Sequence, residues 1–282
     1  MHARNLRRFA AVLLALALIG AAKAYENGTF ALLGGTQKIA SHFWAEYGKG
    51  GSATLKVRQF QPDGTTPILK YDVDMQKTMH LVIVSEDFAN FYHLHPALDV
   101  GSGTFSTPFP PPNYAKYYVF ADTTPHGIGQ QVFRFTYDTG SSGIAPKIST
   151  SASSPDAKAG PYTVILQTTT IAANEPQALD LTVTKGDDPA EDLVPYLGAA
   201  AHCVSIDVKT LQYVHVHPML KGQKMGDMSQ TSMERMENQG KAGPFMTLHM
   251  PPLPAGTYKT WIQIAGGPDQ HVYTAAFTIV AK

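Results

Sequence analysis

Short segments of alternating hydrophobic and polar residues, or of consecutive apolar residues, recur along most of this chain. Glycine, proline and aspartate separate them, which is the pattern of β-strands joined by turns. The predicted strands cover residues 53–60, 79–84, 91–95, 117–121 and 131–137 in the first half, and 162–168, 179–184, 202–208, 213–217, 258–264 and 272–280 in the second. We therefore predict an all-β protein. Residues 36–47 stand apart and predict a short helix, with His42 at its surface.

The second half of the chain repeats the first. Residues 79–96 read MHLVIVSEDFANFYHLHP, and residues 201–218 read AHCVSIDVKTLQYVHVHP. Each segment holds three histidines at the same spacing, and a proline follows the third: these are His80, His93 and His95, then His202, His215 and His217. Further downstream we align Phe105 with Phe245 and Tyr118 with Tyr258. Matches at repeated spacings indicate an internal duplication.

The duplication predicts two modules. Residues 140–160 are rich in serine, glycine, alanine and proline and have no apolar periodicity, which is typical of a flexible linker. We assign a first module to residues 25–140, a linker to residues 141–160 and a second module to residues 161–282. Strands of this length and spacing favour an immunoglobulin-like β-sandwich in each module.

Residues 1–24 have the composition of a signal peptide. Three arginines precede an apolar run over residues 9–20, and Ala22-Lys23-Ala24 fits the small-x-small cleavage rule. We expect cleavage after Ala24 and a periplasmic or secreted mature protein. Because a spanning helix needs ~20 apolar residues, we expect no membrane span after cleavage. An N-terminal membrane anchor is the alternative.

Charge and cysteine content exclude two further features. The chain has 22 basic and 22 acidic residues, and removal of residues 1–24 leaves 18 against 22, a net charge of −4. Nucleic acid is a poor partner for such a chain, because phosphate binding needs clustered lysine and arginine. Cys203 is the only cysteine, so an intramolecular disulfide is impossible. It adjoins His202 in a strand and should point the opposite way, into the core.

Each histidine segment reads as an antiparallel hairpin with a polar break between its strands. A turn centred in that break places His80 opposite His95, and the same count places His202 opposite His217. Opposed residues have Cβ atoms ~5 Å apart, and residues two apart share a face, so each hairpin gathers three imidazoles. Because such trios suit zinc and copper, we predict a metal site in each hairpin. A hydrogen-bonded structural motif and a catalytic site are the alternatives.

Three residues outside the hairpins are candidate further ligands. Asp122 and His126 follow a strand of the first module, and His271 precedes the last strand of the second. Ile262 aligns with Asp122 and cannot bind a metal, so the two sites need not be equivalent. Capping of the following turn is the alternative role for Asp122.

The second module carries a methionine-rich insertion. Between Pro218 and Phe245 it has 26 residues, where the first module has eight at the corresponding place. The insertion includes Met225, Met228, Met233 and Met236, and Met219, Met246 and Met250 lie nearby. Thioethers select Cu(I), which favours copper handling. The same spacing also fits one face of a helix, where methionines would simply pack.

Four segments carry a family resemblance: MHLVIVSEDFANFYHLHP and FADTTPHG in the first module, and YLGAAAHCVSIDVKTLQYVHVHP and YTAAFTIV in the second. They resemble a group of secreted bacterial proteins with HxHP repeats that are described as heavy-metal-binding. The resemblance covers most of the mature chain. It implies that the group's first-strand histidine, its HxHP pair and its aspartate fall on His80 and His202, on His93, His95, His215 and His217, and on Asp122.

These observations together predict an exported protein that binds transition-metal ions, copper or zinc, in metal homeostasis or resistance. Paired β-sandwiches that bind another protein without metal are one alternative. A metal-dependent enzyme is another, which would need an open coordination position and a nearby general base. The sequence has no GxSxG or HExxH motif. A binding protein is therefore favoured over an enzyme.

Overall fold

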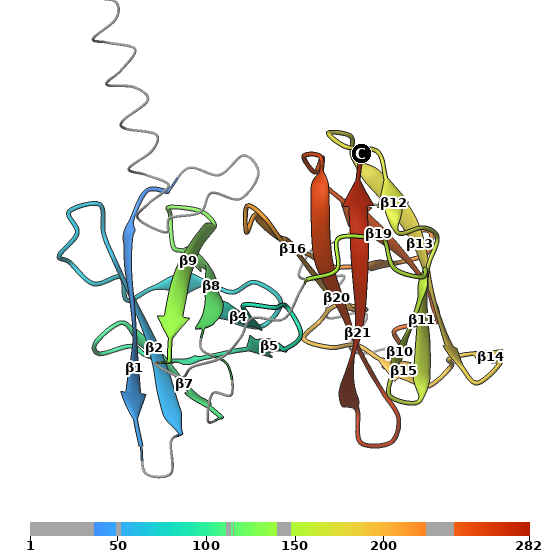
Figure 1. Cartoon of the computed structure of the whole chain (residues 1–282). Coiled ribbons are helices and arrows are strands. Elements are labelled where there is room, and N and C mark those ends of the chain that lie inside the picture. Colours follow the sequence, from blue (N-terminus) through green and yellow to red (C-terminus); the bar gives the residue numbers. More distant parts are fainter. Residues whose placement is uncertain (1–36, 49–51, 111–113, 115, 140–147, 224–239) are drawn as a thin grey trace, which may run out of the picture. The chain divides into compact units, whose positions relative to one another are not determined.

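The computed structural model describes residues 37–48, 52–110, 114, 116–139, 148–223 and 240–282. The predicted signal peptide, residues 141–147 of the predicted linker, and Met225, Met228, Met233 and Met236 of the insertion lie outside the described residues. The described residues form strands and connecting loops, without helices, so the all-β prediction is confirmed (Figure 1). Within that part of the chain, nothing forms a helix able to cross a membrane.

The described residues of the first module form nine strands, which are arranged in two sheets. They are β1 (Ala40–Tyr47), β2 (Ala53–Phe60), β3 (Tyr71–Asp72), β4 (Met79–Ser85), β5 (Phe91–Leu94), β6 (Ala97–Asp99), β7 (Thr104–Phe109), β8 (Lys116–Pro125) and β9 (Gln131–Asp138). One sheet has the order β1-β2-β7-β6; in the other, β5, β4 and β8 are consecutive neighbours and β9 pairs with β8. These orders match strands ABED and C′CFG of an immunoglobulin sandwich.

The second module repeats this arrangement with added strands. They are β10 (Asp156–Ala159), β11 (Tyr162–Leu166), β12 (Thr170–Ile171), β13 (Gln177–Lys185), β14 (Asp188–Pro189), β15 (Leu193–Val194), β16 (His202–Asp207), β17 (Tyr213–Val216), β18 (Met219–Leu220), β19 (Phe245–Met250), β20 (Gly256–Gly266) and β21 (His271–Ala281). One sheet has the order β10-β11-β13-β19-β18, and the other β12-β21-β20-β16-β17. Both modules are β-sandwiches in tandem, as predicted.

Buried and partly exposed residues alternate along the strands, and the buried residues form the core of each module. In β2 every second residue is buried, and Leu55 and Val57 meet Leu81 and Ile83 of the opposite sheet in one apolar cluster, together with Phe105. The second module has its own cluster, to which both of its sheets contribute. Each module therefore buries a core of its own.

The chain forms two compact units, whose boundaries differ slightly from those of the two sequence repeats. The described residues of Met1–Asp72, Met79–Glu86 and Tyr92–Gly143 form the first unit, and those of Val73–Thr78, Asp87–Phe91 and Ile144–Lys282 form the second. Two short segments of the first repeat thus belong by contact to the second unit.

Two local predictions were wrong. Residues 40–47 form strand β1, paired along its whole length with β2, instead of a helix; His42 is exposed, as predicted. Residues 156–159, assigned to the linker, form β10 and pair with β11. In both cases the neighbouring strand supplies backbone hydrogen bonds that local sequence does not reveal.

Downstream of the insertion, our sequence alignment of the two modules differs by one residue from the correspondence that strand pairing gives. His80 on β4 faces Asp122 on β8, whereas His202 on β16 faces Gln263 on β20. Gln263, and not Ile262, is therefore the counterpart of Asp122. Ile262 instead belongs to the apolar core.

The same one-residue difference changes which residue of the second module corresponds to Phe105. Phe105 faces Val57 of β2, and Met246 faces Leu181 of β13, so Met246 is the counterpart of Phe105. Both side chains are completely buried, while Phe245 is 48% exposed. A single-residue shift in a strand moves a side chain to the other face, which explains this contrast.

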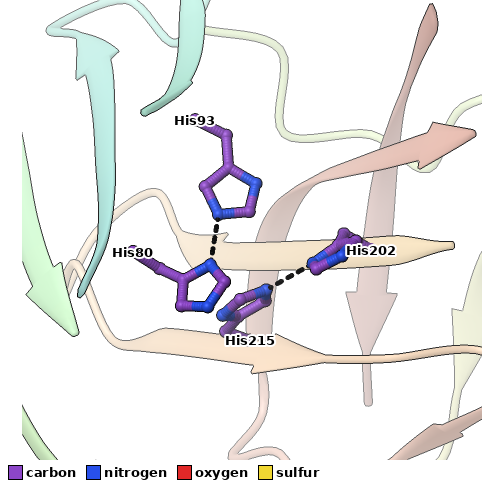
Figure 2. A group of neighbouring side chains, drawn as sticks. All are labelled: His80, His93, His202 and His215. Atoms are coloured by element: carbon purple, nitrogen blue, oxygen red, sulfur yellow. Dashed lines mark hydrogen bonds between the residues drawn. The ribbon is translucent and has the colours of Figure 1, made fainter. Parts of the chain in front are cut away.

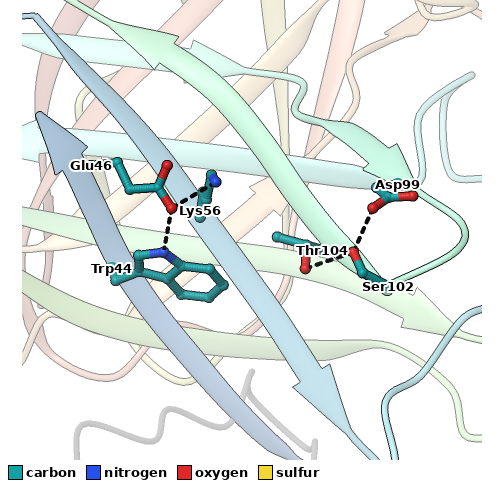
Figure 3. Close-up of polar contacts among 6 residues, drawn as sticks. All are labelled: Trp44, Glu46, Lys56, Asp99, Ser102 and Thr104. Atoms are coloured by element: carbon teal, nitrogen blue, oxygen red, sulfur yellow. Dashed lines mark hydrogen bonds and ion pairs between the residues drawn. The ribbon is translucent and has the colours of Figure 1, made fainter. Parts of the chain in front are cut away.

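Exposed polar side chains form hydrogen bonds on the β1-β2-β7-β6 sheet of the first module (Figure 3). Glu46 accepts hydrogen bonds from Trp44 Nε1 at 3.2 Å and from Lys56 Nζ at 2.7 Å. At another edge, the Ser102 hydroxyl donates to Asp99 Oδ2 at 2.6 Å. Such exposed pairs stabilise a fold by at most about 1 kcal/mol, so the core carries the stability.

Tyr258, near the start of β20, forms the tyrosine corner known from immunoglobulin-like sandwiches. Its hydroxyl donates to the carbonyl of Pro254 at 2.9 Å. Tyr258 faces Asp207 as Tyr117 faces Ser85, so its counterpart is Tyr117 and not the aligned Tyr118. Burial, followed by the Asp207 carboxylate, raises the pKa of Tyr258 to about 12.

Replacing Tyr258 with phenylalanine should therefore weaken the second module. Loss of the hydrogen bond leaves the Pro254 carbonyl without this donor and should cost about 1 kcal/mol. The raised pKa means that the stability contributed by neutral Tyr258 is present below the unfolded pKa of ~10 and is lost as the pH rises toward 12. Urea unfolding at pH 8 and pH 11 should show a smaller alkaline loss in Tyr258→Phe. An equal loss in both proteins would contradict this.

Candidate metal centres

The first histidine of each trio lies on a central strand of its sheet. Leu81 and Ile83 of β4 point into the core cluster, so His80 points to the opposite face of the sheet. In β16, Cys203 joins the core and His202 takes the opposite face. Both histidines are nonetheless buried, at 2% and 1% exposure.

The register of the second hairpin agrees with the prediction. Cys203 pairs with Val216 and Val204 pairs with His215, so His202 comes opposite His217 at the end of the ladder. Pro218 then ends the strand, because proline lacks the N–H that a ladder requires. The chain next enters the other sheet as β18.

The first hairpin brings its three imidazoles together, and Figure 2 shows two of them, His80 and His93. His80 Nδ1 lies 3.0 Å from His93 Nε2. The ring centroid of His95 lies 5.0 Å from that of His80 and 4.7 Å from that of His93. The nitrogen pair at 3.0 Å thus joins His80 to His93, whereas the pair that we predicted is His80 and His95.

The second hairpin has nearly the same geometry. His202 Nδ1 lies 3.3 Å from His215 Nε2, as the dashed line in Figure 2 marks. The ring centroid of His217 lies 4.7 Å from that of His202 and 4.6 Å from that of His215. The repeated spacing in the sequence therefore becomes a repeated arrangement of rings.

The backbone selects the tautomer of His202. Its Nε2 lies 3.0 Å from the carbonyl oxygen of Tyr196. Because a carbonyl only accepts, Nε2 must carry the proton, which leaves the lone pair of neutral His202 on Nδ1. Metal-binding histidines are commonly oriented by such a hydrogen bond from the second ring nitrogen. The nitrogen directed at His215 is thus the one able to bind a metal.

The nitrogen separations suit a coordination site. Two nitrogens that each lie ~2.05 Å from a tetrahedral ion are ~3.3 Å apart. The separations of 3.0 Å and 3.3 Å are close to this edge length. Without an ion, the same separation suits a hydrogen bond between one protonated and one unprotonated nitrogen.

The other predicted ligands do not converge with the trios. Asp122 lies within β8, is 3% exposed, and accepts a hydrogen bond from Gln130 Nε2 at 2.8 Å. His126 is exposed and pairs with Asp72 at 2.6 Å, and the exposed His271 packs on the ring of Tyr273. In the described residues, the donor group close enough to hold one ion includes none of these three predicted ligands, and it includes neither His95 nor His217.

A pocket in the second unit adds a histidine that sequence reasoning missed. The pocket has a volume of about 910 Å³, and all of its lining residues belong to that unit. His215, His217, Met219, His249 and Met250 contribute to its wall. No repeated spacing pointed to His249, because the first module has no histidine at the corresponding position.

The described methionines are buried. Met219, Met246 and Met250 are at most 2% exposed, and the last two belong to the apolar cluster of the second module. Packing therefore accounts for Met246 and Met250. Met219 is buried outside that cluster.

Cys203 is a core residue, as predicted. It is fully buried, and burial raises the pKa of its thiol to about 12. The native protein should therefore not react with a thiol reagent at pH 8 during the time in which the urea-unfolded chain reacts completely, because the thiolate is the reactive form. Rapid labelling of the native protein would contradict the core position.

Comparison with known proteins places the chain in a family. No curated protein matches it. Among solved structures it is similar to MtrC from Shewanella baltica OS185 (8% identity, TM-score 0.26, 87% of this chain and 70% of that one) and to E. coli alpha-2-macroglobulin (11%, 0.21, 87% and 16%). At these TM-scores neither likeness bears on function. A model described as a domain of unknown function, DUF8832, matches residues 37–140 and 157–282. The chain therefore belongs to the DUF8832 family.

Proposed function

We propose that this protein binds transition-metal ions, copper or zinc, through the histidine trio of each hairpin. We further propose that it is exported to the periplasm or secreted, and that it serves metal homeostasis or resistance. The ligands in this proposal are His80, His93 and His95 in the first module, and His202, His215 and His217 in the second. Asp122, His126 and His271 are not needed as direct ligands.

The pairs of convergent ring nitrogens carry the proposal. Each module holds one pair at a separation close to a coordination edge, with a third imidazole beside it. Imidazole nitrogen is a good ligand for both Zn(II) and Cu(II). In the second module the Tyr196 carbonyl also holds His202 in the tautomer whose unprotonated nitrogen, Nδ1, is directed at His215.

A purely structural hydrogen bond is the competing account of each pair. It satisfies buried imidazoles without any ion, and buried polar groups are normally satisfied in some such way. The two accounts differ in one measurable respect. A metal site must bind ions saturably and release protons on binding, since a ligating nitrogen cannot keep its proton.

Calorimetric titration of the mature protein with Zn(II) and Cu(II) tests the proposal. We expect saturable binding of two ions per chain, with a heat that depends on the ionisation enthalpy of the buffer because protons are released. The control is His42→Ala with His271→Ala, which removes two exposed histidines outside the hairpins and should leave binding unchanged. Absence of saturable binding in the wild type would overturn the proposal.

A further inference from the structure

Resting on the proposed function, we infer that the two hairpins, which both bind a divalent ion supplied in excess, prefer different ions when ions compete. The first is a site for a divalent ion, with Asp122 as its charge partner. The second is a site for a soft monovalent ion, Cu(I) or its stable analogue Ag(I), and Met219 and His249 extend its set of ligands.

A buried carboxylate distinguishes the first hairpin. Asp122 faces His80 across β4 and β8, which places their Cβ atoms ~5 Å apart on one face. The side chain is 3% exposed, and Gln130 orients one of its oxygens. In its ionised form, this carboxylate would offset the charge of a divalent ion held by neutral imidazoles.

The second hairpin lacks this charge. Gln263 occupies the corresponding position opposite His202, and it donates to Thr274 Oγ1 at 3.3 Å. The cost of transferring an ion from water into a low-dielectric site grows with the square of its charge, so a divalent ion costs about four times as much as a monovalent ion of equal size. The position opposite His202 therefore contributes no charge that offsets a divalent ion, and the carboxylate in the wall of the neighbouring pocket is that of Asp74.

The second hairpin also has softer donors close by. Met219 on β18 faces Thr247 of β19, and His249 follows Thr247 by two residues, so both side chains share one face of that sheet. Both also line the pocket that contains His215 and His217. Thioether and imidazole ligands together suit Cu(I).

The first module has no such donors at the corresponding positions. Ala97 faces Ser106 as Met219 faces Thr247, so Ala97 is the counterpart of Met219. Two residues beyond Ser106 the chain has Pro108, which is thus the counterpart of His249. Neither alanine nor proline has a donor side chain. A carboxylate therefore faces the first histidine of the trio only in the first hairpin, and the thioether and imidazole of the pocket wall lie only beside the second.

Ag(I) and Zn(II) titrations of the full mature chain test this division. The methyl carbons of selectively labelled methionines, followed by NMR, report whether Ag(I) binds a thioether. We expect the Met219 methyl to shift on addition of Ag(I) but not Zn(II). Met219→Leu combined with His249→Gln should lower the affinity of the second hairpin for Ag(I) at least tenfold and leave Zn(II) binding at the first unchanged. Met246→Leu, a buried methionine outside the pocket wall, is the matched control.

The reciprocal variant concerns the first hairpin. Asp122→Asn keeps the shape of the side chain but removes its charge, and should lower Zn(II) affinity by about 10–100-fold with unchanged Ag(I) binding. Absence of saturable ion binding in the wild type would overturn the proposed function itself. Two saturable sites with equal Ag(I) and Zn(II) preferences, or an Ag(I) affinity unaffected in the Met219 and His249 variant, would overturn only the division of ions.

Discussion

Replacing His80 and His95 with alanine is expected to remove one of two bound ions per chain while the second hairpin keeps its own. His80 supplies one nitrogen of the convergent pair, and the His95 ring is the third member of the trio. The variant leaves a single imidazole, His93, which cannot hold an ion with comparable affinity. Calorimetry with Zn(II) and elemental analysis of the purified protein both measure the stoichiometry.

The mirror variant, His202→Ala with His217→Ala, should remove the other ion. Because both variants create cavities at buried or half-buried positions, circular dichroism must first show that each protein is folded. Unchanged stoichiometry in either variant would contradict the assignment of ligands. Loss of both ions in one variant would show instead that the hairpins do not bind independently.

The second large effect concerns stability. Phe105→Ala should destabilise the first module by about 3–5 kcal/mol, and Met246→Ala should destabilise the second by about 2–5 kcal/mol, because both truncations leave cavities in a packed core. Phe245→Ala should change stability by no more than about 0.5 kcal/mol, because that side chain is 48% exposed. The sequence alignment, which pairs Phe105 with Phe245, predicts the opposite outcome for the second module.

Urea unfolding followed by tryptophan fluorescence separates the two modules. Trp44 lies on β1 of the first module and Trp261 on β20 of the second, so removing one tryptophan leaves a reporter for the other module. The Trp44→Phe background then reports the Phe245 and Met246 variants. A loss in Phe245→Ala as large as that in Met246→Ala would contradict the register described above.

Alternating hydrophobicity determined much of the strand content, because one face of each strand packs against the core. The prediction of β2 over residues 53–60 agrees with the structure, and β4, β16 and β17 differ from prediction by only one residue at their ends. Short edge strands such as β6 and β18 carry too few residues for any periodicity, so sequence reasoning missed them.

The histidine hairpins were also predictable, because a hairpin is local: a turn and a period of two are enough to bring His202 opposite His217. The tautomer of His202 was not predictable, since the Tyr196 carbonyl that selects it comes from another segment. Residues far apart in sequence meet only when strands pair, and no spacing within one strand encodes that register.

The all-β class, the duplication and the two histidine trios are predictable from the sequence, because each depends on periodicity or spacing over a few residues. Only the pairing of distant strands shows that Gln263 and not Ile262 faces His202, and that His249 and Met219 line the pocket beside the second trio. Because the insertion separates β18 from β19, the sequence gives no sign that the correspondence between the modules changes by one residue beyond it. Cross-strand hydrogen bonding resolves it, because each backbone N–H and C=O must pair in one register to bury the apolar face.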